Sequence, residues 1–161
     1  MPTKSKEMQY LIRQYRETTG NQDVEMHEVA KFAVSKGWPL PKPRTALDRL
    51  ASQFSAAARE EMRKDEVTGH PYRANLAVTA LVGGEQMTFW YDIETATRKV
   101  AHKSLTLRRE QMVGDALQLT FDAMHWNRIN PQDEPIEMPL DFADDVAWRM
   151  NAPDDKNEEA A

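Results

Sequence analysis

The side chains in this sequence that are best suited to catalysis or metal binding are few and scattered. The four histidines stand at positions 27, 70, 102 and 125, and no H-E-x-x-H motif joins any two of them. Asp122 and His125 lie three residues apart on a predicted helix and could share a metal ion, because that spacing places both side chains on one face. A metal site needs a third or fourth ligand from elsewhere, and the sequence indicates none. We therefore predict no metal ion and no cofactor.

Signatures of nucleotide hydrolysis and of serine hydrolases are missing. Gly83-Gly84 lacks the Lys and Ser/Thr that follow the glycines of a phosphate-binding loop, and no G-x-S-x-G motif occurs. Asp141, Asp144 and Asp145 form a loose acidic cluster, which capping and the helix dipole explain at the start of a helix. We predict a protein without enzymatic activity, although an active site can also assemble from scattered residues.

Basic residues provide the stronger chemical signal. Residues 98–109 form the densest basic stretch of the chain. Its cations, which we predict to contact DNA phosphates, are Arg98, Lys99, Lys103, Arg108 and Arg109. Residues 1–112 contain 18 Lys and Arg against 14 Asp and Glu, whereas residues 113–161 contain 3 against 12. This asymmetry is typical of a basic body that carries an acidic appendage. An acidic C-terminal end that only aids solubility explains the same asymmetry equally well.

Composition indicates an ordinary soluble domain. The chain has 161 residues, of which 40% are hydrophobic and 29% charged, enough for one domain with a core. It contains no cysteine, which excludes disulfides and fits a reducing compartment. No stretch approaches the length and hydrophobicity of a membrane span. We expect a cytoplasmic protein with a single globular domain over residues 1–150 and a disordered acidic tail over residues 151–161.

The stretch from Tyr72 to Ile93 predicts a β-hairpin around which the chain is organised. Gly83-Gly84 separates two β-rich runs, and two glycines allow both central residues of a tight turn to adopt positive φ. Counting outward from the turn pairs Val82 with Glu85, Ala80 with Met87, Val78 with Phe89, Leu76 with Tyr91 and Ala74 with Ile93. These residues, except Glu85, form one apolar face. On the opposite face we expect Arg73 to pair with Glu94.

Helical periodicity predicts five helices around this hairpin, so the fold class is α+β. The helices cover residues 4–18, 23–36, 45–65, 104–126 and a short segment after Asp141, with an extended strap over residues 131–140. Asp23 is expected to cap the second helix, and Thr45 with Asp48 has the spacing of a capping box for the third. The third helix has an apolar stripe that we expect to be buried: Leu47, Leu50, Phe54, Ala57, Ala58 and Met62.

The predicted helix 104–126 is apolar on two sides. Its two apolar lines consist of Val113, Leu117, Phe121 and Met124, and of Met112, Ala116, Leu119, Ala123 and Trp126. Such a helix lies centrally in a core or is shared between two subunits. Gly114 weakens it by about 1 kcal/mol relative to Ala, which suggests close packing there. We predict that four residues contact a partner protein or a second copy of the chain: Trp90, Leu119, Trp126 and Trp148.

The order of three helices and a hairpin resembles a winged helix-turn-helix domain over about residues 4–94, to which residues 95–150 add the long helix and the strap. The residues that carry the resemblance are Glu28-Val29-Ala30 in the second helix, Thr45 to Leu50 in the third, and the hairpin as the wing. In such domains the third helix enters the major groove of DNA, and the wing touches the backbone or the minor groove. The resemblance implies that Arg44, Thr45, Arg49, Ser52 and Gln53 face DNA, with Arg73 and Lys99 near phosphates.

Two functions follow from these observations. A small DNA-binding or DNA-associated regulator or accessory protein, with double-stranded DNA as its partner, is favoured by the order of elements and by the basic stretch. A protein–protein adaptor or assembly subunit, acting as a homodimer or with another protein, is favoured by the net charge of −5, the two-sided helix and the tryptophans. Winged-helix folds also serve as protein-docking modules, so the resemblance alone does not decide between them.

Overall fold

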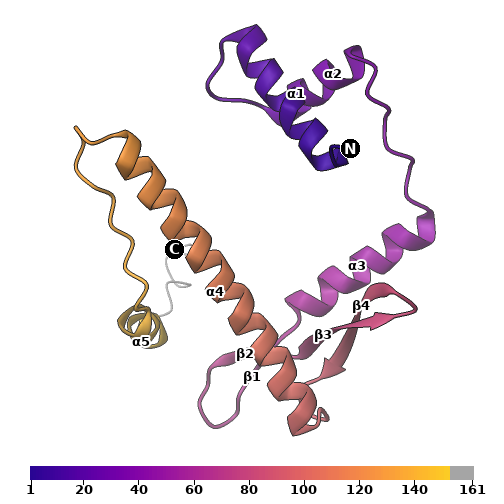
Figure 1. The fold of residues 1–161 in the computed structure, drawn as a ribbon. Helices are drawn as coiled ribbons and strands as arrows, with labels where there is room; N and C mark the ends of the chain where they lie inside the picture. The colour runs from indigo at the N-terminus through magenta and orange to yellow at the C-terminus, as the bar shows by residue number, and fades with distance from the viewer. Residues whose placement is uncertain (153–161) are drawn as a thin grey trace, which may run out of the picture. The chain divides into compact units, whose positions relative to one another are not determined.

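The structure is a computed structural model that describes residues 1–152. Within that range it has five helices and two two-stranded antiparallel sheets, which confirms the predicted α+β class (Figure 1). The chain divides into two compact units, Met1–Gln53 and Phe54–Ala161. The single domain over residues 1–150 stays a prediction. From residue 153 on, the predicted acidic tail lies outside the described residues.

The N-terminal unit contains a pair of helices. Helix α1 (Lys4–Thr19) ends, as predicted, at Gly20, which adopts the left-handed φ of 72° that glycine tolerates. Helix α2 (Met26–Ser35) packs on α1, and two of its residues are buried. The rings of Tyr15 and Phe32 meet edge to face with their centroids 5.6 Å apart. The pair is therefore held by an aromatic contact and by the two buried residues of α2, Val29 and Ala33.

The N-cap of α2 is Glu25, so the predicted cap at Asp23 is wrong. The Glu25 carboxylate accepts hydrogen bonds from the backbone N–H groups of His27 and Glu28, each at 3.0 Å. The bond from the His27 N–H is the main cause of the lowered pKa of Glu25. The longer glutamate side chain reaches these N–H groups from the residue directly before the helix, so α2 starts later than the sequence indicated.

Helix α3 (Ala46–Glu60) begins with the predicted cap. The Asp48 N–H donates to Thr45 Oγ1 at 3.1 Å, and the Thr45 hydroxyl donates to the Asp48 carboxylate at 2.7 Å. The predicted burial of its apolar stripe is wrong. Every member of the stripe is exposed except Ala58, which is half-buried, and Phe54 is 69% exposed. Periodicity indicated an apolar face, but it did not show whether another element covers that face.

The third helix ends earlier than predicted because the chain turns into a short sheet. Strand β1 (Met62–Lys64) pairs with strand β2 (Pro71–Arg73) in an antiparallel ladder. Between them, Asp65 Oδ1 accepts hydrogen bonds from the N–H groups of Val67 at 2.9 Å and Thr68 at 2.7 Å, which closes the turn. Strands of three residues are too short to give an alternating pattern, so the sequence did not reveal them.

Strands β3 (Asn75–Val82) and β4 (Glu85–Asp92) form the predicted hairpin. Their register runs from Asn75 opposite Asp92 to Val82 opposite Glu85, and within this range it agrees with the prediction pair by pair. Gly83 and Gly84 have φ values of 59° and 84°. A tight hairpin turn requires such left-handed values, which glycine adopts without strain.

The core of the C-terminal unit lies at β3. Leu76 and Val78 are buried, and only 1% of Leu76 is exposed. Helix α4 (Arg98–Ile129) packs on this strand. Buried Ser104 donates its hydroxyl to the Ala77 carbonyl oxygen at 2.8 Å. This hydrogen bond fixes the first half of α4 against the hairpin.

Helix α4 begins at Arg98 rather than at the predicted Ser104, so the basic stretch forms its first turns. Thr97 caps it by accepting a hydrogen bond from the Val100 N–H at 3.3 Å. Its 32 residues give a length of about 48 Å. One helix therefore carries the basic stretch at its start and the two apolar lines in its second half.

Most of the predicted apolar lines of α4 lie at the surface of the described chain. The exposed members are Met112, Val113, Leu117, Leu119, Phe121, Met124 and Trp126. The strap predicted for residues 131–140 begins with a turn at residues 131–133, where the Asp133 N–H donates to the Asn130 carbonyl oxygen at 3.2 Å, and it has no regular secondary structure after that. The segment runs back along the helix, and Asn127 holds it through two hydrogen bonds to the backbone of Ile136, each at 2.9 Å (Figure 1).

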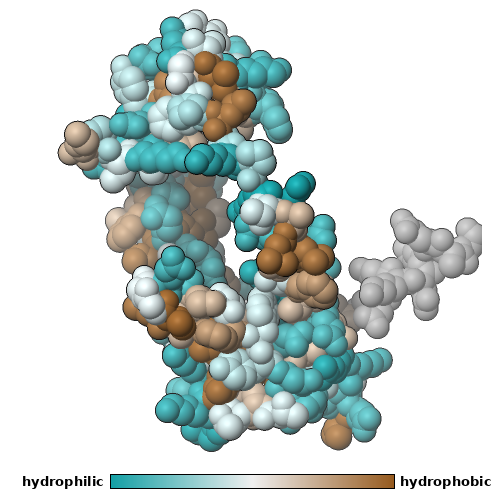
Figure 2. Space-filling view, turned by 90° about the vertical axis from the view of Figure 1, so that its right-hand side faces the viewer, coloured by the Kyte–Doolittle hydropathy of each residue, from teal (hydrophilic) through white to brown (hydrophobic). Residues whose placement is uncertain are grey.

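The last helix, α5 (Ala143–Asn151), follows the strap. The N-cap of α5 is Phe142, so the predicted cap at Asp141 is wrong. Asp141 lies one residue earlier, and its Oδ1 accepts a hydrogen bond from the Ala143 N–H at 3.1 Å. The described residues of α5 are all exposed, including Trp148. Apolar side chains also reach the surface in several separate patches on the face drawn in Figure 2.

Candidate nucleic-acid interface

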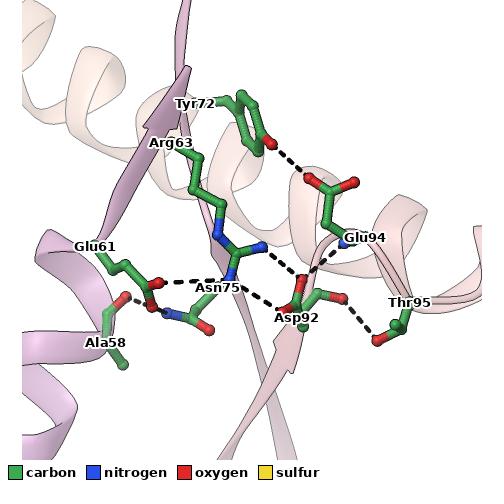
Figure 3. Close-up of polar contacts among 8 residues, drawn as sticks. All are labelled: Ala58, Glu61, Arg63, Tyr72, Asn75, Asp92, Glu94 and Thr95. Carbon is green, nitrogen blue, oxygen red and sulfur yellow. Dashed lines mark hydrogen bonds and ion pairs between the residues drawn. The ribbon is translucent and has the colours of Figure 1, made fainter. Parts of the chain in front are cut away.

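A charged network joins the end of α3 to both sheets. Arg63 of β1 binds the Asp92 carboxylate with two hydrogen bonds, Nη1 to Oδ1 at 3.0 Å and Nη2 to Oδ2 at 3.1 Å (Figure 3). Its Nη2 also lies 3.4 Å from Glu61 Oε1. Hydrogen bonds between charged groups favour the charged forms. The pKa of Asp92 is therefore lowered by Arg63, and the pKa of Arg63 is raised by Asp92.

Two further side chains complete the network. The Tyr72 hydroxyl donates to the Glu94 carboxylate, and this bond raises the pKa of Tyr72 because the ionised phenol cannot donate. Asn75 donates through Nδ2 to the Ala58 carbonyl at 3.1 Å and to Glu61 Oε2 at 2.9 Å. Each carboxylate at this junction is thus bound by a neighbouring donor (Figure 3).

These contacts replace the predicted pair between Arg73 and Glu94. Arg73 lies in β2 opposite Met62, outside the β3–β4 register, and Glu94 is bonded to a tyrosine instead. The predicted strand is interrupted at Ala74, whose N–H donates to the Glu61 carbonyl at 3.0 Å. Because β2 pairs with β1 rather than with β4, Arg73 belongs to a different sheet from the one predicted.

A concavity of about 330 Å³ lies between the hairpin and the first half of α4. Its lining includes Arg59 from the end of α3, Arg73 from β2 and Arg108 from α4. No carboxylate of the described chain lines it, and the acidic groups nearby are bound in the network above. A concavity with charges of one sign focuses the electric field and attracts ligands of the opposite sign.

Trp90 supplies the aromatic part of this concavity. The guanidinium carbon of Arg59 lies 5.4 Å from the centroid of the Trp90 ring, within the range of a cation–π contact. Thr79 and Gln111 line the same space and offer a hydroxyl and an amide for hydrogen bonds. Cations, a flat aromatic ring and neutral hydrogen-bonding groups together suit the phosphates and bases of a nucleic acid.

The structure brings some of the predicted DNA-contact residues together and leaves others apart. Arg73 and Arg108 both line the concavity. Four others are exposed on the first turns of α4, namely Arg98, Lys99, Lys103 and Arg109. The remaining five belong to the N-terminal unit: Arg44, Thr45, Arg49, Ser52 and Gln53.

Arg59 is the cation of the site that the sequence did not single out, and the sequence did not indicate Thr79 and Gln111 either. Arg59 stands apart from the basic stretch, and only the fold places it beside Trp90. A weak signal was present, because Arg59 falls away from the apolar stripe of the predicted third helix. No pattern in the sequence relates it to a ring 31 positions later.

The predicted protein-contact residues fall into two groups. Trp90 is half-buried in the concavity. Leu119 and Trp126 are exposed on the second half of α4, and Trp148 on α5 is 72% exposed. Trp90 therefore belongs to the concavity, whereas Leu119, Trp126 and Trp148 are accessible to another chain.

Asp122 and His125 do not form the start of a larger metal site in the described structure. Asp122 accepts a hydrogen bond from Gln118 at 2.8 Å. Within residues 1–152, no group of three or more His, Asp or Glu side chains is arranged to hold a metal ion.

Comparisons with protein-family models, with curated proteins and with solved structures each give no match. The helices of the described part of the chain include none that is long and apolar enough to cross a membrane. The concavity and the cations around it are therefore the features from which we infer a function.

Proposed function

We propose that the protein is a DNA-binding or DNA-associated accessory protein without enzymatic activity. The observation that carries this proposal is the convergence of Arg59, Arg73 and Arg108 on a concavity without a lining carboxylate among residues 1–152. Guanidinium groups stay charged at physiological pH and present a planar fork of donors that matches phosphate oxygens. Three of them around one space favour a ligand with repeated negative charge.

The first turns of α4 extend this basic surface. Lys103 lies one helical turn before Leu107, which lines the concavity, and Arg98 and Lys99 precede it on the same helix. If the four exposed cations on the first turns of α4, together with Arg73 and Arg108, each contact a phosphate, about six phosphates are neutralised. The logarithm of the binding constant for duplex DNA then falls with the logarithm of the salt concentration with a slope of about −5.

The start of α3 supplies a second DNA contact in this proposal. In a winged helix-turn-helix domain the third helix enters the major groove. Arg49, Ser52 and Gln53 are exposed on α3, and Arg44 and Thr45 directly precede it. The order of the elements and the exposure of these side chains support this part of the proposal, in which the β3–β4 hairpin acts as the wing.

A second candidate function is that of a protein–protein adaptor or assembly subunit. It is favoured by the exposed apolar side chains on the second half of α4 and on α5, among them Phe121, Met124 and Trp148. Exposed apolar surface of this kind commonly marks a protein interface. The two functions are compatible, because the concavity uses the first half of α4 and the apolar side chains lie on the second.

Fluorescence anisotropy with labelled DNA of mixed sequence, single-stranded and duplex, tests the proposed function. The expected result is binding that weakens steeply as the salt concentration rises. Light scattering on the same samples tests the second candidate, which predicts a defined oligomer. Failure to bind DNA of either form at low salt, where electrostatic attraction is strongest, would exclude the proposed function.

A further inference from the structure

The concavity has the size of a site for one nucleotide. At about 330 Å³ it stands near the lower end of the range for small-ligand sites, which is about 300–1,000 Å³. Phosphate contacts alone give no role to an aromatic ring. Duplex DNA keeps the faces of its bases stacked on one another, so a ring can reach such a face only when the base is outside the stack.

We propose that the concavity binds one unpaired nucleotide of a single-stranded nucleic acid. The base stacks against Arg59 and Trp90, and Arg73 and Arg108 bind the neighbouring phosphates. This inference rests on the proposed function, because it names the form of nucleic acid that the same site takes.

Arg59 and Trp90 form the platform for the base. The guanidinium carbon lies over the ring at 5.4 Å from its centroid, so the two groups are already within cation–π range of each other in the free protein. Aromatic rings and guanidinium planes both stack on bases, and they do so with little dependence on sequence because every base has a flat face. The platform therefore predicts binding that tolerates different bases.

The wall of the concavity is fixed before a ligand arrives. Asn75 is held by its two hydrogen bonds to Ala58 and Glu61, and the backbone at Ala77 is held by Ser104. A site whose wall is already ordered loses less conformational entropy when it binds. Thr79 and Gln111 then offer hydrogen bonds to the edge of a base without rearrangement of the hairpin.

Arg73 and Arg108 are the phosphate-binding groups of the site. Neither forms an ion pair with a carboxylate of the described chain, whereas Arg63 is committed to Asp92. They come from β2 and α4, on separate elements that both line the concavity. This separation suits consecutive phosphates of a strand whose base enters between them.

Anisotropy titrations with single strands of about 12 nucleotides, one of thymidine and one of uridine nucleotides, test the inference beside a duplex of the same length. At equal salt, the protein is expected to bind at least one single strand about tenfold more tightly than the duplex. Tryptophan fluorescence should fall when the unlabelled strand is added, because a base stacks at Trp90. The two strands show whether the nucleotide is taken from DNA, RNA or both.

Single-residue variants test whether the base stacks at Trp90. Trp90→Ala should weaken single-strand binding by about tenfold, since stacking of one base on an aromatic side chain contributes roughly 5- to 150-fold in affinity. Trp148→Ala, which removes an exposed tryptophan on α5, is the control and should leave the affinity unchanged. If Trp90→Ala does not fold, Trp90→Phe should keep most of the affinity and lose the fluorescence change, and Arg59→Gln should weaken single-strand binding.

The outcomes separate this inference from the proposed function. Duplex bound as tightly as both single strands, or a fluorescence change that persists in Trp90→Phe, overturns the inference and leaves DNA binding in place. Failure to bind any of the three nucleic acids at low salt overturns both. Tight single-strand binding that Trp90→Ala weakens and Trp148→Ala does not is the result that we expect.

Discussion

Arg63 and Asp92 form a two-point ion pair at the base of the hairpin, with N–O distances of 3.0 and 3.1 Å. The pair commits the Asp92 carboxylate to β1, and Glu94 is likewise committed to Tyr72. The acidic side chains at this end of the hairpin are thus bound by partners outside the lining of the concavity. The network therefore contributes to the basic character of the site as well as to the fold.

Asp92→Asn tests the ion pair through its pH dependence. Arg63 lowers the pKa of Asp92 below its usual value near 4, so the pair stabilises the fold above that pH. This contribution is lost as the pH falls through the lowered pKa. Urea unfolding should show a lower stability for Asp92→Asn near pH 7 and a smaller difference near pH 3. High salt should also reduce the difference, because both side chains are partly exposed. A difference that is unchanged at acidic pH would contradict the assignment.

The Tyr72–Glu94 hydrogen bond predicts a loss of stability at alkaline pH. Glu94 raises the pKa of Tyr72 above its usual value of about 10, so the bond is fully present below that pH. It is lost as the pH rises through the raised pKa. In an absorbance titration, the wild type should contain a late-ionising tyrosine that is missing from Tyr72→Phe. The interpretation fails if the titration curves of the wild type and Tyr72→Phe differ only by one tyrosine that ionises at the usual pKa.

Two leucines of β3 test where the core lies. Leu76 is 1% exposed and Leu81, on the opposite face of the strand, is 77% exposed. Leu76→Ala should lower the free energy of unfolding by about 2–5 kcal/mol, because it leaves a cavity. The matched change Leu81→Ala should alter it by no more than about 0.5 kcal/mol. Chemical denaturation measures both. A large effect at Leu81 would show that another chain covers that face.

Gly114→Ala tests whether α4 is packed against a partner. The sequence suggested close packing at Gly114, but in the described chain a Cβ there would meet nothing within 4 Å. Alanine is the better helix former, so the variant should gain about 0.5–1 kcal/mol in the free energy of unfolding. Denaturation and light scattering measure stability and mass. Destabilisation together with a change of mass would show that α4 is packed against a second chain, as the assembly-subunit function predicts.

The hairpin is the part of the fold that the sequence predicted in detail. Gly83-Gly84 and the alternation of side chains are local signals, and they determine the register from Asn75 to Asp92. The cap formed by Thr45 and Asp48 is local as well. Each of these features depends on residues within a few positions of one another or directly across a turn.

The site depends on contacts that no local pattern contains. Arg63 meets Asp92 across 29 positions of the chain, and Asn75 meets Ala58 across 17. These contacts exist because β1 and β2 form a small sheet whose strands are too short to show periodicity. The sequence could therefore single out Arg73 and Arg108 as candidate phosphate contacts, but it could not show that Arg59 lines the same concavity.

The most direct measurement of the central claim is the DNA affinity of the double variant Arg73→Gln/Arg108→Gln. The matched control is Arg128→Gln/Arg149→Gln, which likewise removes two cations, both of them exposed and one about 30 Å along α4 from Arg108. The proposal predicts that the first variant binds at least about tenfold more weakly, with a salt slope reduced by about 2, while the control binds almost as wild type. If the folded Arg73→Gln/Arg108→Gln protein binds DNA as tightly as the control, the concavity is not the nucleic-acid site.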